Sequence, residues 1–406
     1  MLSITNLLCG QQAGNERLRY GHTMAAGSST DRNVAVPKPV VVWALTRACN
    51  LRCVHCYASA TAAPDTGELT RREGMALLDD LRGFGVPAVL LSGGEPLTRP
   101  EALDFIAHAQ SIGLATTLST NGLLIDNAMA DRLAQSGLRY VGISLDGIES
   151  RHDQLRGQQG AFAASLAAID RCRSRGIKVG ARFTVHALNW RDLDAIFDIC
   201  LEHNVQRLCV YHLAYSGRGG NMQKVDLAAD QIRSIVDRIF ERSTQIHQSG
   251  RHLEVLTVDN HADAAYMLLR LQRDNDPRLA DVQARLRGTG GNRSGCNIAS
   301  IDPKGNVHYD QFSWHYNCGN VRTQPFSTIW SQATDPRLAI LRNRRAHLPQ
   351  RCQSCRFVDV CNGNLRTRAE AATGDWMGFD PGCYLTEAET TAPVAAPALA
   401  EPAMAG

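Results

Sequence analysis

A regular alternation of short apolar runs and amphipathic stretches occupies the first half of the chain. The apolar runs have the length of buried strands and cover residues 40–46, 88–92, 115–119, 140–145, 178–185 and 207–212. Helical periodicity fills the intervals at residues 69–84, 101–112, 126–135, 162–175 and 193–203. Strands that alternate with helices in this way form a parallel sheet through right-handed crossovers. We therefore expect an α/β fold, a partial (β/α)6 barrel of the TIM type that is open on one side.

The remainder of the chain lacks this regular alternation. Residues 1–36 show little periodicity, which predicts an irregular N-terminal leader. The expected regions that follow are a repeating core, a mostly helical linker, a cysteine-rich domain and a disordered tail, at residues 37–225, 226–290, 291–385 and 386–406. A turn sequence at 303–306 predicts that the cysteine-rich domain opens with a hairpin over 298–309.

Composition excludes several classes of protein. A formal net charge of +3 over 406 residues is too small to indicate a nucleic-acid partner. No apolar stretch reaches the roughly 18 residues that a membrane span needs, and a secretory signal is not visible near residue 1. Thirteen cysteines in a chain of this kind indicate metal binding in a reducing compartment rather than disulfides. We expect a cytoplasmic enzyme with neither a nucleic-acid nor a membrane partner.

Three cysteines follow the first predicted strand directly. Cys49, Cys53 and Cys56 have the spacing C-x3-C-x2-C and lie where parallel α/β folds place their active sites. A zinc ion or buried thiols are the alternatives, but zinc normally takes a fourth protein ligand. His55 lies inside the loop and is too close in sequence to supply it without strain. Three thiolates leave one corner of a four-iron cluster open, which predicts a reaction site.

Polar residues follow the next strands in the same register. Gly93 and Gly94 let the backbone approach a ligand closely, and Glu95 offers an acceptor for a cationic amine. Further candidates at or near strand ends are Ser119, Ser144 and Arg182. Taken singly, each of these residues is equally well explained as a capping or turn residue.

A second set of cysteines lies near the C-terminus. Cys352, Cys355 and Cys361 have the spacing C-x2-C-x5-C, and Cys383 follows after 21 residues. Four such thiolates suit zinc or an iron–sulfur cluster, and the spacing does not decide between them. Cys296 and Cys318 would need two further ligands to hold another cluster.

Three patches rich in histidine and aromatic residues lie near the expected mouth of the barrel, at 211–219, 259–263 and 312–316. A lone histidine is usually structural, but the grouping predicts substrate contacts. The candidates are His212, Tyr215, Arg218, His261 and His315. Arg218 and Arg322 are also suited to bidentate binding of substrate carboxylates.

The first cysteine loop, Tyr57 and the Gly-Gly-Glu-Pro segment at 93–96 resemble the radical S-adenosylmethionine (SAM) superfamily. This resemblance implies a [4Fe-4S] cluster on Cys49, Cys53 and Cys56, with SAM bound to the open iron. It also implies that SAM contacts come from the polar residues at 93–95, Ser119, Ser144 and Arg182. A low-potential electron donor such as ferredoxin or flavodoxin is a further expected partner.

The second cysteine set resembles the SPASM/twitch extensions of the same superfamily, together with residues 319–321 and 326–330. This resemblance assigns the domain at 291–385 and favours iron over zinc. Because Asn362 and Asn364 stand where fuller versions add another cysteine, the expectation is one auxiliary [4Fe-4S] cluster with complete cysteine ligation.

Residues 211–219, 258–263 and 361–364 are similar to the enzymes of siroheme-derived tetrapyrrole pathways, among them didecarboxysiroheme deacetylases and heme d1 biosynthesis enzymes. The resemblance implies an iron-tetrapyrrole substrate and removal of acetate groups from didecarboxysiroheme to give iron-coproporphyrin. The alternatives are action on propionate side chains, as in heme d1 biosynthesis, and maturation of a ribosomal peptide by a SPASM enzyme. Peptide maturases often carry an N-terminal winged-helix domain, for which residues 1–36 are too short. A purely structural metal scaffold would not explain three cysteines beside Gly-Gly-Glu-Pro.

Overall fold

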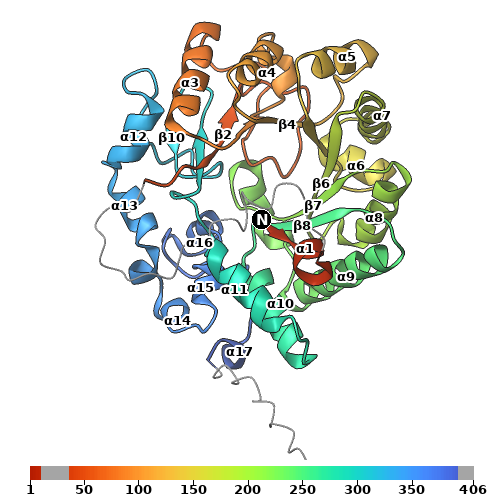
Figure 1. Cartoon of the computed structure of the whole chain (residues 1–406), viewed down its shortest axis with the longest axis vertical. Coiled ribbons are helices and arrows are strands. Elements are labelled where there is room, and N and C mark those ends of the chain that lie inside the picture. The colour runs from red at the N-terminus through yellow and green to blue at the C-terminus, as the bar shows by residue number, and fades with distance from the viewer. Residues whose placement is uncertain (11–35, 392–406) are drawn as a thin grey trace, which may run out of the picture.

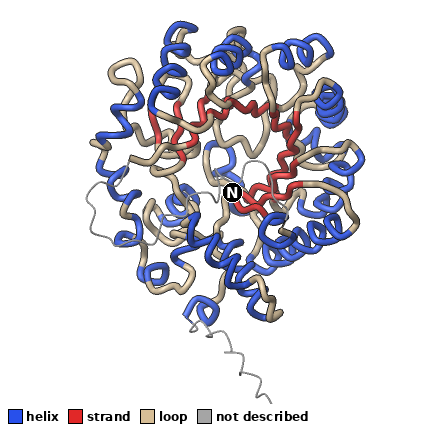
Figure 2. Tube along the Cα trace, in the orientation of Figure 1, coloured by secondary structure: helices blue, strands red, loops and turns tan. Residues whose placement is uncertain are grey.

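One curved sheet organises the molecule. The structure is a computed structural model that describes residues 1–10 and 36–391. In these residues ten strands form a single sheet with the order β1-β8-β7-β6-β5-β4-β3-β2-β9-β10. The strands are β1 (Leu2–Ser3), β2 (Val40–Ala44), β3 (Val89–Ser92), β4 (Thr116–Thr120), β5 (Tyr140–Ser144), β6 (Lys178–Val185), β7 (Arg207–His212), β8 (Glu254–Val258), β9 (Ile298–Ile301) and β10 (Val307–His308). Figure 2 shows them as an open arc with helices on its outer side.

The six predicted strands are confirmed as β2 to β7, and neighbouring members of this set pair in parallel. The helices between and after them cover the sheet (Figure 1). They are α3 (Arg71–Phe84), α4 (Ala102–Ser111), α5 (Asn127–Gln135), α6 (Glu149–Arg156), α7 (Ala161–Ser174), α8 (Leu193–Glu202), α9 (Ala229–Gln248), α10 (Ala262–Arg273) and α11 (Leu279–Thr289). This is the α/β partial barrel expected from the sequence.

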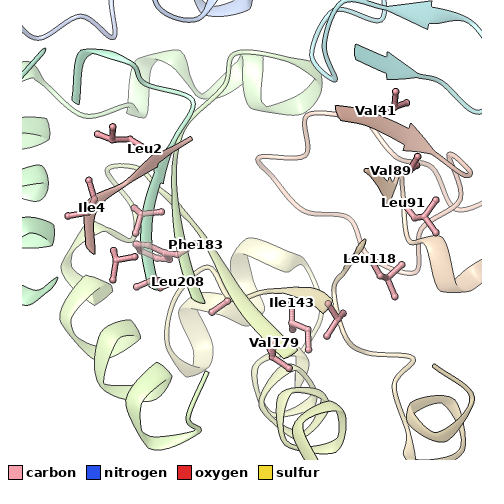
Figure 3. Close-up of a cluster of buried hydrophobic side chains, with 14 of the residues drawn as sticks. Leu2, Ile4, Val41, Val89, Leu91, Leu118, Ile143, Val179, Phe183 and Leu208 are labelled. Carbon is pink, nitrogen blue, oxygen red and sulfur yellow. The ribbon is translucent and has the colours of Figure 1, made fainter. Parts of the chain in front are cut away.

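Local sequence and burial both favour these elements. In α3, Thr70 and Glu73 form a capping box, and Gly85 ends the helix in a left-handed conformation. The apolar side chains of the parallel strands are buried, as in the cluster that contains Val89, Ile143 and Phe183 (Figure 3). A parallel sheet covered by helices buries its strands on both faces, so apolar runs mark them clearly in the sequence.

The structure corrects the expected irregular leader. The first residues form β1, antiparallel to β8, and then α1 (Ile4–Cys9), which packs on α9. Ile4 and Leu7 are buried there. A six-residue helix is too short to be stable alone, so tertiary burial rather than local periodicity accounts for it. The part of the predicted leader at residues 11–35 lies outside the described residues.

Two other regions hold elements that the sequence did not predict. The expected helical linker contains α9, α10 and α11, but also β8, a further parallel strand beside β7. In the expected disordered tail, α17 (Glu387–Thr391) is helical, and residues 392–406 lie outside the described part. Both elements are only five residues long, so each offers little pattern to read.

The sheet continues into the cysteine-rich region. β9 pairs in parallel with β2, and β9 and β10 form the predicted hairpin. The remaining helices are short: α12 (Phe326–Gln332), α13 (Pro336–Arg342), α14 (Gln350–Gln353), α15 (Val358–Cys361) and α16 (Arg366–Thr373). The core and the cysteine-rich region therefore share one continuous sheet.

An ion pair also joins these regions, and it gives Arg322 a role other than the predicted one. Its guanidinium donates to both carboxylate oxygens of Glu73, over 2.7 and 3.0 Å, and to the carbonyl oxygens of Gly67 and Glu68. The pKa of Glu73 is lowered to about 2. The hydrogen bond from Arg322 is the largest cause, and the hydrogen bond from the Thr70 amide is the next. The pair therefore stabilises the fold above pH 4.5, and the contribution fades as the pH falls towards 2.

We expect Arg322→Ala to lower the free energy of unfolding at pH 7 by no more than about 1 kcal/mol, because about a third of each side chain is exposed to solvent. Urea unfolding would measure this change. Arg71→Ala, at the still more exposed pair with Asp104, is the matched control and should cost less. A loss of several kcal/mol would show that Arg322 carries more of the contact between regions than its exposure suggests.

Candidate active site

The three cysteines of the first set face one cavity at the carboxyl end of the parallel sheet. The cavity encloses roughly 1170 Å³ of empty space, part of it open to solvent, and Cys49, Cys53 and Cys56 all line it. Each sulfur accepts one N–H donor: Leu51 N lies 3.3 Å from Cys49 Sγ, and Ala60 N lies 3.5 Å from Cys56 Sγ. Arg156 Nη1 lies 3.5 Å from Cys53 Sγ. Such hydrogen bonds to sulfur are typical of iron–sulfur ligation.

Burial affects the chemistry of these thiols directly. It raises the pKa of Cys49 to about 12, so this thiol stays protonated without a cationic partner. A bound metal removes that proton outright, which makes the site suited to iron. No group of three or more His, Cys, Asp or Glu side chains within the described ranges is arranged to hold a single metal ion. Three thiols suit three corners of a four-iron cluster, whereas a structural zinc ion normally takes a fourth protein ligand.

A buried network supports the cysteine loop from behind. Asp146, just after β5, accepts hydrogen bonds from Arg156 Nη2, from His55 Nε2 over 2.9 Å and from the Thr184 amide over 2.7 Å. Burial alone would raise the pKa of Asp146, but the Arg156 guanidinium and His55 hold it well below its usual range. Nε2 of His55 is thereby turned towards a buried carboxylate.

Gly93 and Gly94 bring the segment after β3 against the cysteine loop. A Cβ atom on Gly94 would lie 2.1 Å from the Ala48 carbonyl oxygen, and one on Gly93 would lie 2.5 Å from that of Thr46. The Gly94 amide donates to Thr46 O over 2.8 Å. Any larger residue would separate the two segments, so these glycines hold the cavity wall together and leave its backbone open to a ligand.

Glu95 is not among the residues that line the cavity, although the sequence suggested that it would meet a ligand there. It is buried behind the wall, and one oxygen accepts from the Leu97 amide and Thr120 Oγ1, the other from the Asn121 amide. Burial raises the pKa of this carboxyl, and the three hydrogen bonds oppose that rise. Glu95 thus joins the ends of β3 and β4, with two hydrogen bonds to Oε1 and one to Oε2.

The other predicted SAM contacts line the cavity together. Arg182 Nη1, from β6, donates to Ser119 Oγ of β4 over 2.7 Å, and Ser144 of β5 lies between their strands. Burial lowers the pKa of Arg182, but nearby tyrosines raise it by more. The net effect is a raised pKa, so the guanidinium stays cationic. The three side chains place a positive charge and two hydroxyl groups on one stretch of wall.

Only two of the five predicted substrate residues line the cavity. His212 and Arg218 line the cavity; Arg218 donates Nε and Nη1 to the carbonyl oxygens of Cys53 and Ala60, each 2.8 Å away, and its buried Nη2 has no hydrogen-bond partner within the described residues. Tyr215 donates to Asp226, and His315 is half-exposed and bonded to Glu370. His261 lines a smaller, separate pocket beside Met1.

The cavity also holds Arg156, which the sequence did not single out, together with Asp259, Tyr57 and Phe312 from segments that it did. Arg156 comes from α6, a helix that the sequence analysis did not predict, so no signal pointed to it. Asp259 is the only carboxylate among the lining residues, and burial raises its pKa to about 6. The ring of Tyr57 packs edge-on against Phe312, with 5.4 Å between centroids. These residues bring an acid group and aromatic surface to the wall.

The four cysteines of the second set line a pocket of their own. They come from α14, α15 and neighbouring loops, and Cys355 Sγ accepts from the Phe357 amide over 3.4 Å. Burial raises the pKa of Cys352 to about 11, so this set also favours a metal partner. Cys296 and Cys318 are buried outside this pocket.

No helix within residues 1–10 and 36–391 combines the length and apolar character needed to cross a membrane.

Comparisons with known proteins agree with this geometry. Residues 43–200 match the radical SAM superfamily, and residues 293–356 match the SPASM iron–sulfur cluster-binding domain. The chain is 46% identical to the Fe-coproporphyrin III synthase of Methanosarcina barkeri over 96% of its own length and 98% of that protein. It is 41% identical to the pre-heme d1 synthase of Dinoroseobacter shibae, over 87% and 88% of the two chains.

Among solved structures, Streptococcus suis SuiB bound to S-adenosylmethionine has the same fold, with a TM-score of 0.68 and 18% identity over 86% of this chain and 78% of that one. The chain therefore carries the [4Fe-4S] cluster and SAM of the radical SAM superfamily, and its C-terminal region is an iron–sulfur domain. The chain belongs to the radical SAM superfamily, among the enzymes that carry a C-terminal SPASM domain.

Proposed function

We propose that this protein removes the acetate side chains of didecarboxysiroheme and gives iron-coproporphyrin III. The observation that carries this proposal is its similarity to an Fe-coproporphyrin III synthase along almost the whole of both chains. The cavity supports it, because thiols, SAM contacts and aromatic and histidine side chains share one enclosed space.

Cys49, Cys53 and Cys56 would hold a [4Fe-4S] cluster whose open iron would bind SAM, and together these cofactors would supply the radical chemistry that removes a hydrogen atom from the substrate. The chain's own residues prepare the cavity for that chemistry. Arg182 and Ser119 offer charge and hydrogen bonds to the carboxylate or ribose of SAM. Tyr57 and Phe312 close part of the wall with apolar surface and keep water from the reacting carbon.

The second site is proposed to hold one auxiliary [4Fe-4S] cluster, bound by Cys352, Cys355, Cys361 and Cys383. Four thiols around one pocket complete its ligation and leave no iron open. We propose a ferredoxin or flavodoxin as the low-potential electron donor. Iron and sulfide counting on the wild type and on a Cys296→Ala/Cys318→Ala variant would test the number of clusters.

The second candidate function is action on propionate side chains, as in heme d1 biosynthesis. The 41% identity to a pre-heme d1 synthase favours it. Both functions use the same kind of substrate and the same cluster chemistry, so only the product distinguishes them.

Mass spectrometry of the product is the test. The reconstituted protein is incubated without oxygen with didecarboxysiroheme, SAM and dithionite. Loss of two acetate units supports the proposal, and loss of propionate carbon supports the heme d1 alternative. If 5′-deoxyadenosine forms and the tetrapyrrole is unchanged, the proposed substrate is wrong. If no 5′-deoxyadenosine forms, the assignment of the first cluster site is wrong as well.

A further inference from the structure

A buried chain of hydrogen bonds leads from the cavity to the second cysteine site. His212, at the end of β7, contacts Asp263 at the start of α10, with 2.9 Å between Nε2 and Oδ2. The other oxygen of Asp263 accepts from the Tyr384 hydroxyl over 2.8 Å. All three side chains are buried, and Tyr384 directly follows Cys383 in the sequence. The sequence pointed to His212 and to the patch that contains Asp263, but not to a contact between them.

These partners determine which nitrogen of His212 is available. The Tyr384 hydroxyl donates to Oδ1 of Asp263, which leaves Oδ2 to face His212. A carboxylate only accepts, so Nε2 of His212 is the donor in this contact. The lone pair of the ring is then on Nδ1, which makes no hydrogen bond within the described residues.

His55 and His212 differ in the surroundings of their Nδ1 atoms. Both histidines line the cavity, and both turn Nε2 towards a buried aspartate. The Nδ1 atom of His55 is covered by protein atoms and has no partner, whereas Nδ1 of His212 is not covered in this way. Asp146 beside His55 also has the Arg156 cation, but no Lys or Arg pairs with Asp263 in the described part of the chain.

Among the described residues, Asp263 is thus a buried carboxylate that pairs with an imidazole and with no Lys or Arg. A buried charge is stable only when it is compensated, and a cation bound to the far nitrogen of that imidazole would compensate it. Metal-binding histidines almost always donate their other N–H to a carboxylate or carbonyl, which fixes the ring and makes it a stronger ligand. The proposed substrate brings such a cation, the iron at the centre of the tetrapyrrole.

We propose that His212 binds the iron of the tetrapyrrole substrate through Nδ1 as an axial ligand, with Asp263 and Tyr384 as positioning residues. This inference rests on the proposed function, because it takes an iron-tetrapyrrole as the substrate. It selects one histidine from the three that the sequence suggested. The tetrapyrrole ring would then lie against Nδ1 of His212, at the end of β7.

The test is anaerobic titration of reconstituted protein with ferric coproporphyrin III, followed by the Soret band and by low-spin ferric electron paramagnetic resonance. The wild type should give the spectrum of a histidine-ligated iron. His212→Ala should lose that spectrum and bind at least about 10-fold more weakly, and added imidazole should restore the spectrum. Because free imidazole also ligates ferric coproporphyrin III in solution, the restored spectrum is scored only on tetrapyrrole that stays with the protein through gel filtration, which requires a folded cavity.

Matched controls separate ligation from other roles. His261→Ala and His315→Ala remove the two candidates outside the cavity and should leave the spectrum unchanged. Tyr384→Phe keeps the ring and removes only the donor to Asp263, so it should shift the ligation spectrum without abolishing it. Metal-free coproporphyrin III should bind the wild type and His212→Ala equally.

Several results would overturn the inference. One is an unchanged iron spectrum in His212→Ala, and another is the absence of histidine ligation in the wild type when binding occurs. Equal weakening of the metal-free ligand would show that His212 binds a carboxylate instead. These outcomes are distinct from failure of the proposed function, in which the wild type would bind no tetrapyrrole or would leave didecarboxysiroheme unchanged.

Discussion

Replacing Cys53 with alanine is expected to abolish SAM cleavage and to lower the iron content by roughly the four atoms of one cluster. Cys53 is the buried member of the first set, and its sulfur accepts the hydrogen bond from Arg156. Without it, two thiolates remain, and they cannot hold three corners of a cubane. Iron and sulfide analysis and the yield of 5′-deoxyadenosine with dithionite would measure the two effects.

Cys172→Ala is the matched control for this variant. Cys172 is buried on α7 and lies in the hydrophobic core, outside both cysteine sets. Its loss should leave the iron content and the 5′-deoxyadenosine yield at wild-type levels. Full activity in Cys53→Ala, or loss of iron in Cys172→Ala, would contradict the assignment of the cluster site.

Replacing Arg368 with methionine is expected to lower the free energy of unfolding by about 3–5 kcal/mol, because it leaves a buried carboxylate unpaired. Arg368 donates to both oxygens of Asp380 over 2.7 and 3.0 Å, and each side chain is 1% exposed. It also donates to the carbonyl oxygens of Leu213 and Asp259, each 3.0 Å away. Arg368 therefore ties the loop that carries Cys383 to the ends of β7 and β8.

Chemical unfolding of the variant would measure this loss, and we expect the auxiliary iron to fall with it. Arg345→Met is the control, because it breaks a pair with Asp359 in which both side chains are more than half exposed. That change should cost less than about 1 kcal/mol. Similar costs for the two variants would show that the Arg368 pair is not the support that its burial indicates.

The parts of the fold that the sequence predicted are those in which burial follows a repeating pattern. The strands from β2 to β7 are apolar because helices cover them, and α3 carries its own capping residues at Thr70 and Glu73. The hairpin of β9 and β10 has a turn sequence of its own, with Gly305 in a left-handed conformation. In each case the information lies within a few neighbouring residues.

The parts that escaped prediction depend on contacts between distant segments. β1 forms because it can pair with β8, which follows about 250 residues later. Glu95 has the same neighbours in sequence whether it faces a ligand or the amides after β4, so only the fold shows its partners. The local sequence around the three histidines also does not show that His212 lines the cavity and that His261 and His315 do not.

The short β1 strand also covers an edge of the sheet that could otherwise pair with another chain. An unpaired strand at the edge of a sheet is a template for pairing with another chain, and proteins commonly cover such edges. β1 occupies the outer side of β8, and β10 ends the other side of the sheet as a strand of only two residues. A shortened chain that begins after Cys9 would uncover β8, so its self-association at high concentration would be the expected sign of that lost cover.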